Sequence, residues 1–258
     1  MNFFFFSAIS GVVLIIAPVY LALRFRKEWK MPKGLFLRAG ATFLVLEIFH
    51  FAAMDSALSY WPDFMGYHFM VQAVILGIIA GLFFELGRFF VLDKLFRKVR
   101  KMKEGLYFAL GWNGVVTFLV GFLFLLGSIG MYIMATTPDI MTLFPPESGV
   151  DAEMAQLYQD QSIELMGSFP LYGLVFLLER AALLILDLFM TLLILVGLTY
   201  GQNRFAWFAA LGHAGFFMLV FSAQRFDTLI YIPVLIGISL LLFWGLQKLK
   251  PLFLEKKT

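Results

Sequence analysis

Apolar stretches long enough to cross a lipid bilayer recur along the whole chain, and they restrict its fold more than any other feature. A transmembrane helix needs about 20 mostly apolar residues. The stretches of this kind are residues 3–23, 34–53, 69–92, 105–134, 171–199, 205–222 and 229–247. With 61% hydrophobic and 14% charged residues, the chain has too little polar surface to cover them as a soluble core. We predict an all-α polytopic membrane bundle of seven transmembrane helices, forming a single integral membrane domain over residues 1–258.

The charged residues sort by loop. Basic side chains occupy two loops and the tail: Arg24, Arg26, Lys27, Lys30, Lys33 and Arg38, then Lys94, Arg97, Lys98, Arg100, Lys101 and Lys103, then Lys248, Lys250, Lys256 and Lys257. The loop of residues 136–170 contains acids and neither Lys nor Arg. Because basic loops stay in the cytoplasm, we predict an external N-terminus, an internal C-terminus and an acidic outer loop at residues 136–170.

Within that outer loop we predict a helix over about residues 150–166, in which apolar and acidic side chains alternate irregularly. One interpretation is a short helix that covers the outer mouth of the bundle. The other is a lid or a docking surface for a partner protein. The sequence leaves both open.

Composition also excludes several classes of site. The chain has no cysteine, so disulfides, thiolate nucleophiles and cysteine-ligated metals are ruled out. Its three histidines, His50, His68 and His213, offer little for a metal site. We expect no metal and no cofactor. The net charge of +3 does not indicate a nucleic-acid partner, whereas contact with membrane lipids follows from the spans themselves.

Ionisable residues inside the apolar stretches are the candidates for function. Glu85 and Arg88 lie three residues apart, so they share one face of their helix. Such groups are costly in a bilayer and mark either a functional site or a pair that holds helices together. Both interpretations apply here, because an intrahelical ion pair would also explain the spacing.

The depths of the polar side chains suggest that they meet. At about 1.5 Å per residue, Glu85 lies roughly 10 Å from the inner end of its span, Asn113 and His213 roughly 12 Å, and Asp187 roughly 18 Å. We therefore predict a shared polar pocket of Glu85, Arg88, Asn113, Asp187 and His213. The alternatives are that His213 is a packing residue and that Asn113, between Gly111 and Gly114, marks close helix packing.

Four short segments resemble the YhfC family of intramembrane proteases, relatives of the CAAX-processing glutamic proteases in a group that includes the seven-helix scaffold subunit of gamma-secretase. The segments are Phe84-Glu-Leu-Gly-Arg88, Leu110-Gly-Trp-Asn-Gly114, Leu178-Glu-Arg-Ala181 and Leu211-Gly-His-Ala214. The resemblance extends over nearly the whole chain in helix order. It implies a cytoplasmic (inner) membrane location and the candidate catalytic residues Glu85, Arg88, His213 and Asp187.

The active-site pattern is degenerate. Phe84, Trp112 and Phe217 stand where the resemblance places a glutamate, a histidine and an aspartate, and Asp187 stands where it places a second histidine. In such an enzyme a glutamate activates water, and histidines stabilise the oxyanion or hold a metal. Only part of that set remains here.

Three functions follow, and whether the protein is an enzyme stays open. The leading hypothesis is a non-catalytic scaffold or assembly subunit of a membrane complex, whose partners are other membrane subunits. The first alternative is an active glutamic-type intramembrane endopeptidase acting on a membrane-protein substrate, with Glu85 as base, His213 as oxyanion or water partner and Asp187 as auxiliary. The second alternative is a permease or transporter subunit with Asp187 and Glu47 on its path, although no inverted repeat supports it.

Overall fold

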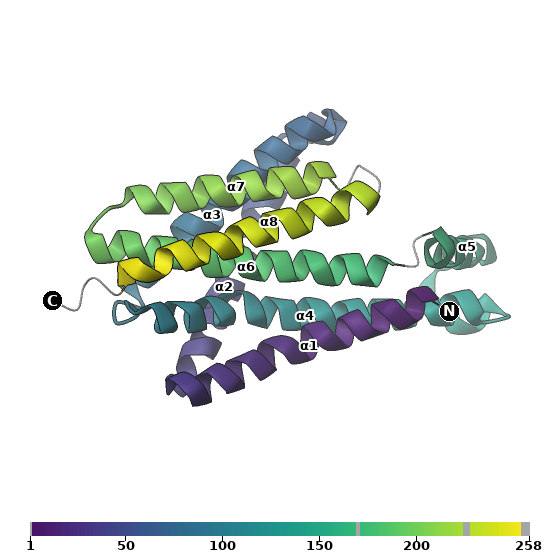
Figure 1. The fold of residues 1–258 in the computed structure, drawn as a ribbon. Helices are drawn as coiled ribbons and strands as arrows, with labels where there is room; N and C mark the ends of the chain where they lie inside the picture. Colours follow the sequence, from purple (N-terminus) through teal and green to yellow (C-terminus); the bar gives the residue numbers. More distant parts are fainter. Residues whose placement is uncertain (1, 169–170, 224–227, 254–258) are drawn as a thin grey trace. The chain divides into compact units, whose positions relative to one another are not determined.

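The computed structural model describes residues 2–168, 171–223 and 228–253, and these residues form helices joined by short connections (Figure 1). The long helices are α1 (Asn2–Trp29), α2 (Lys33–Tyr60), α3 (Phe69–Lys94), α4 (Met102–Thr136), α6 (Tyr172–Tyr200), α7 (Arg204–Ala223) and α8 (Thr228–Leu249). All seven are long and apolar enough to cross a membrane. The predicted all-α fold with seven membrane-spanning helices is confirmed, while the orientation of the termini stays a prediction.

Several helices are longer than the apolar stretches predicted from the sequence. The reason is that a helix ends where its backbone is capped, which need not be where its apolar residues end. α1 runs on to Trp29 and stops at Lys30, which adopts a left-handed conformation with φ 54°. The amide of Met31 then donates to the carbonyl of Arg26 at 3.2 Å, and Pro32 follows. This is the hydrogen bond of a Schellman motif, in which the left-handed residue is usually glycine.

The chain forms two compact units. Unit 1 contains Met1–Ala17 and Thr117–Arg180, and unit 2 contains Pro18–Val116 and Ala181–Thr258. The single membrane domain over residues 1–258 stays a prediction.

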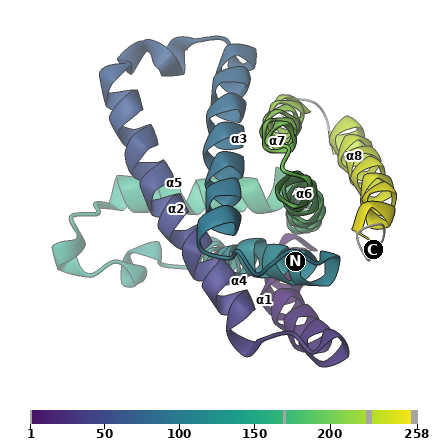
Figure 2. The ribbon, with the colours of Figure 1, turned by 90° about the vertical axis from the view of Figure 1, so that its left-hand side faces the viewer.

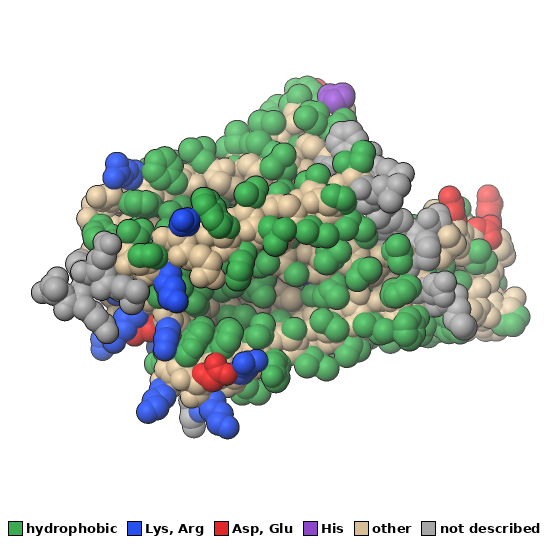
Figure 3. Space-filling view, viewed as in Figure 1, with side chains coloured by type: hydrophobic (Ala, Val, Ile, Leu, Met, Phe, Trp, Pro, Cys, Tyr) green, Lys and Arg blue, Asp and Glu red, His purple; other side chains and the backbone are tan. Residues whose placement is uncertain are grey.

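Unit 1 includes α5 (Ala152–Ser168), which confirms the helix predicted over about residues 150–166, while its place in an outer loop stays a prediction. It is preceded by the short 3-10 helices η2 (Ile140–Leu143) and η3 (Pro146–Ser148). The amide of Gln159 on α5 donates to the carbonyls of Met134 and Thr137, at 3.1 and 2.8 Å, and so attaches α5 to the end of α4. The acidic side chains of α5 lie on the surface (Figure 3).

In unit 2, α3 and α7 run side by side (Figures 1 and 2). Two glycines on α3 bring their backbones together. A Cβ atom added at Gly77 would lie 2.8 Å from the carbonyl oxygen of Ala214, and one added at Gly81 would lie 2.8 Å from its amide nitrogen. Small residues four apart let membrane helices approach closely. Glu85 lies one turn beyond Gly81, and His213 precedes Ala214, so this contact brings the two side chains together.

A second close contact in unit 2 joins α2 to α4. A Cβ atom at Gly111 would lie 2.8 Å from the Cα of Phe36, so the two helix backbones approach closely there. The same stretch of α4 carries Trp112 and Asn113. α2 connects to α3 through the 3-10 helix η1 (Pro62–Gly66), and α8 continues into η4 (Lys250–Phe253).

Candidate functional site

The cluster of unit 2 begins with two charged residues on α3 that have no exposed surface. Glu85 and Arg88 both have 0% relative exposure, and Arg88 Nη1 lies 3.3 Å from Glu85 Oε2. The other carboxylate oxygen of Glu85 contacts Nδ1 of His213 on α7, which is 5% exposed. Glu85 is therefore shared between a guanidinium on its own helix and an imidazole on the neighbouring one.

Arg88 also joins α3 to α6. Its Nη1 donates to the backbone carbonyl of Asp187 at 3.1 Å, and its Nη2 forms an ion pair with the Asp187 carboxylate. The second oxygen of that carboxylate accepts a hydrogen bond from the side-chain amide of Asn113 on α4. The structure thus brings together all five side chains of the predicted polar pocket, from four helices. Their catalytic role stays a prediction.

Charge explains why this cluster is stable in an apolar surrounding. One guanidinium faces two carboxylates, and the imidazole and the amide supply the remaining contacts. Buried charges persist only when they are paired and hydrogen-bonded. Each carboxylate here has a cation and a second polar partner, so neither is isolated.

Aromatic side chains pack around the cluster, among them Phe84, Trp112 and Phe217. Phe84 stacks on Phe43 of α2 at 5.4 Å between ring centroids, and Phe43 meets Trp112 edge to face at 5.2 Å. Trp112 has 0% exposure, and the Arg88 guanidinium carbon lies 5.1 Å from its ring centroid, a cation–π contact. The His213 ring stacks on Phe217 at 5.1 Å.

Sequence reasoning missed two residues of this region. Phe43 links Phe84 to Trp112, but nothing distinguishes it among the 32 phenylalanines of the chain. Thr191 is fully buried one turn after Asp187 on α6. That spacing of four residues places it on the same helix face, and it was the signal that could have identified it.

Four buried polar atoms of this region have no hydrogen-bond partner among the described residues: Glu85 Oε2, which has only its ion-pair contact with Arg88, together with Arg88 Nε, Trp112 Nε1 and Thr191 Oγ1. Two of them are N–H donors. A polar group without a partner is costly in a low-dielectric interior, so each such atom calls for an explanation.

The other ionisable residues considered in the sequence analysis lie outside the buried cluster. Glu47 and His50 form their own pair on α2, with Oε2 and Nδ1 3.8 Å apart. His68 caps the start of α3, where its Nδ1 accepts from the amide of Met70 at 3.4 Å. Glu179 and Arg180 belong to unit 1, where the Arg180 guanidinium carbon lies 5.1 Å from the ring centroid of Phe176.

Comparison with known families gives one match. The model of the family described as YhfC intramembrane metalloprotease matches residues 12–236, most of the chain. No curated protein and no solved structure matches.

The description of that family implies a metal ion, and the donors found here do not fit one. Among residues 2–168, 171–223 and 228–253, no group of three or more histidine, aspartate or glutamate side chains is arranged to hold a metal. A zinc site needs three or four such ligands. In the cluster, Arg88 forms ion pairs with the carboxylates of both Glu85 and Asp187. Its positive charge would repel a metal cation placed between these two carboxylates.

Proposed function

Because the chain belongs to the YhfC intramembrane metalloprotease family, we propose that it is a non-catalytic member, a scaffold or assembly subunit of a membrane complex that keeps the protease-like helical bundle. The observation that carries the proposal is the engagement of both carboxylates, Glu85 and Asp187, by the single buried guanidinium of Arg88. The proposal includes a cytoplasmic membrane location, with the N-terminus outside.

A general base must reach the proton that it removes, directly or through one water molecule. Glu85 has 0% exposure, and its two oxygens face Arg88 and His213. Both oxygens are thus already in contact with side chains of the protein. These contacts suit a group that holds α3 and α7 in register better than one that activates water.

The aromatic substitutions support the same conclusion. Phe84, Trp112 and Phe217 place large rings where the sequence resemblance predicts polar groups, and each of them packs against a neighbouring ring. Stabilisation of a tetrahedral intermediate needs donors aimed at the developing oxyanion. The phenyl rings of Phe84 and Phe217 offer no such donor.

A second candidate function, peptide hydrolysis, is favoured by a specific observation. Glu85 contacts His213 directly, which is the arrangement of a carboxylate and an imidazole that orient water. In addition, Trp112 Nε1 and Arg88 Nε are buried donors without an acceptor among the described residues. In a hydrolase these two N–H groups would be available to a developing oxyanion.

One experiment separates the two functions. Membranes from cells that express the wild-type chain, the isosteric variant Glu85→Gln or no chain are cross-linked, and the captured membrane proteins are identified together with their terminal peptides. We expect the same partners with wild type and Glu85→Gln, and no partner fragment that depends on Glu85. A partner whose new terminus is present with wild type and absent with Glu85→Gln would overturn the scaffold proposal and establish the hydrolase.

A further inference from the structure

The largest of the cavities described in unit 2 lies at the basic end of the helices, away from the buried cluster. Its volume is about 1090 Å³, and it is lined by the connection between α1 and α2, the connection between α3 and α4, the end of α6 and the segment η4. These segments are far apart in the sequence. The cavity is therefore a product of the tertiary fold.

Positive charge dominates this cavity. Among the described residues, five cationic side chains line it: Lys30, Arg100, Lys101, Lys103 and Lys250. Glu104, the acidic residue in the described part of the lining, accepts hydrogen bonds from the backbone amides of Arg100 and Lys101, at 3.1 and 3.2 Å. Burial lowers the pKa of Arg100, yet a guanidinium remains charged at neutral pH. Lys and Arg side chains gather at this end of unit 2 (Figure 3).

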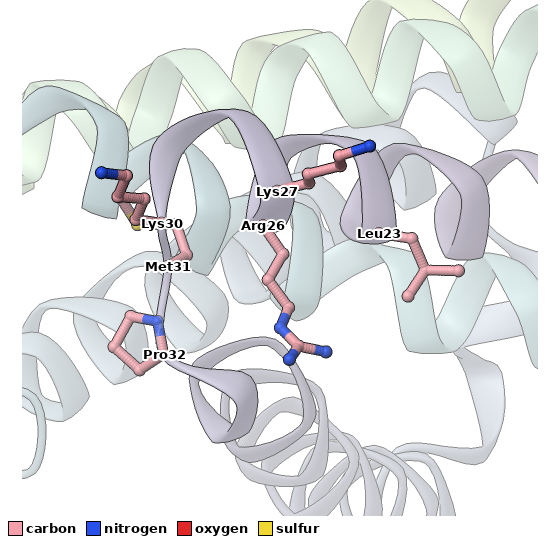
Figure 4. Close-up of a pocket in the computed structure, with 6 residues that line it drawn as sticks. All are labelled: Leu23, Arg26, Lys27, Lys30, Met31 and Pro32. Atoms are coloured by element: carbon pink, nitrogen blue, oxygen red, sulfur yellow. The ribbon is translucent and has the colours of Figure 1, made fainter.

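The backbone at Lys30 is the second observation. Lys30 has φ 54°, the left-handed conformation that favours glycine, at the position that ends α1. A side chain there costs backbone strain, and strain of this kind concentrates at functional sites. Lys30, Met31 and Pro32 also line a neighbouring cavity of about 550 Å³ with Arg26 and Lys27, shown in Figure 4. In that view the ammonium groups of Lys27 and Lys30 point away from each other.

Apart from Thr199, the rest of the lining is apolar. Trp29, Met102, Leu198 and Phe253 contribute to the same cavity as the cations. The hydroxyl of Tyr200 donates to the carbonyl of Leu252 at 2.8 Å and fastens η4 over the end of α6. A ligand that fits must combine negative charge with an apolar part, and it must be present where membrane helices end.

We propose that this cavity binds an anionic phospholipid, with its phosphate among Lys30, Lys101 and Lys250 and its acyl chains along the apolar lining. Basic pockets between membrane helices bind anionic head groups in this manner. Spread-out surface charge would attract the same lipids without a preferred site. In this cavity, by contrast, the lipid phosphate has defined partners, Lys30, Lys101 and Lys250.

The test uses native mass spectrometry of the purified full chain in detergent, titrated with dioleoylphosphatidylglycerol or dioleoylphosphatidylcholine. We expect retained phosphatidylglycerol adducts and little phosphatidylcholine. The double variant Lys30→Gly/Lys250→Gln should bind phosphatidylglycerol about 25-fold more weakly, at about fivefold for each charge. Its melting temperature should not fall, because glycine relieves the left-handed backbone at position 30.

The matched control is Lys98→Gln/Lys248→Gln, which removes two exposed charges from the same end without touching the cavity lining. It should leave phosphatidylglycerol binding within about twofold of wild type, since screening weakens exposed charges at a distance. Equal losses in both double variants, or no loss in either, would overturn the proposal. A competition experiment adds glycerol 1-phosphate at the same concentration as phosphatidylglycerol. Complete displacement of the lipid would assign the site to soluble phosphates and overturn the lipid assignment.

Discussion

In both units, helices pack closely at glycines, but the buried polar side chains near these contacts differ between the units. In unit 1, α1 meets α4 at glycines: a Cβ atom at Gly11 would lie 3.2 Å from the Cα of Leu125, and one at Gly121 would lie 3.1 Å from the amide of Ile15. Among the side chains that the structure describes, the buried polar ones on these two helices in unit 1 are hydroxyls, Ser7, Ser10, Thr117 and Ser128. In unit 2, the contact of Gly77 and Gly81 with α7 leads directly into a cluster of buried charges.

This difference shows that packing alone does not require the charges. Small residues and an occasional hydroxyl are enough to hold membrane helices together, as α1 and α4 demonstrate in unit 1. Taking carboxylates and a guanidinium out of water costs several kcal/mol per ion before their attraction repays it. The cluster in unit 2 therefore indicates a specific helix register or a functional site.

Of the variants that compare the two units, Arg88→Ala should cause the largest loss of stability. Removal of the guanidinium leaves Glu85 and Asp187 buried without their common cation, and such a change costs about 3–5 kcal/mol. Ser128→Ala in unit 1 removes a hydroxyl that bonds only within its own helix and should cost under about 1 kcal/mol.

Melting temperatures in detergent measure both changes, and Glu47→Gln serves as a third reference, also with a small expected effect. Equal melting temperatures for Arg88→Ala and Glu47→Gln would contradict the assignment of Arg88 as the cation that holds the cluster together.

Alanine substitutions at one glycine in each unit compare the two helix contacts directly. Gly81→Ala and Gly121→Ala each push a methyl group toward the backbone of a facing helix, so each should destabilise its unit by about 1–3 kcal/mol. Only Gly81→Ala should also separate Glu85 from His213. The ¹⁵N chemical shifts of the His213 imidazole report that contact, and they should change with Gly81→Ala and stay constant with Gly121→Ala. Constant shifts in both variants would mean that the cluster does not depend on the α3–α7 contact.

The smallest effect is expected from two buried hydroxyls without a partner among the described residues, Thr191 in unit 2 and Ser7 in unit 1. Thr191→Val and Ser7→Ala remove a polar group that gains no hydrogen bond, so stability should stay within about 1 kcal/mol of wild type or rise slightly. Chemical denaturation or thermal melting measures both. A loss above about 2 kcal/mol for Thr191→Val alone would show that this hydroxyl belongs to the polar cluster.

Much of the site was predictable because depth in a helix can be counted along the sequence. Glu85, Arg88, Asn113, Asp187 and His213 were grouped by their distance from the inner ends of their spans, and the structure brings them together. Depth does not give the rotation of a helix about its axis. Hence Phe43 was missed, and Arg88 was assigned only its neighbour Glu85.

The sequence by itself determined the number of spanning helices and their approximate limits. It also determined the predicted separation of basic from acidic loops and the depth of each polar residue along its helix. These properties depend on hydropathy and on the constant rise of a helix, both of which are local. Only the tertiary structure decided that Arg88 pairs with Asp187, 99 residues away, and that distant basic segments line one cavity. Partner choice depends on how helices rotate and pack against each other, and that depends on side chains from several segments at once.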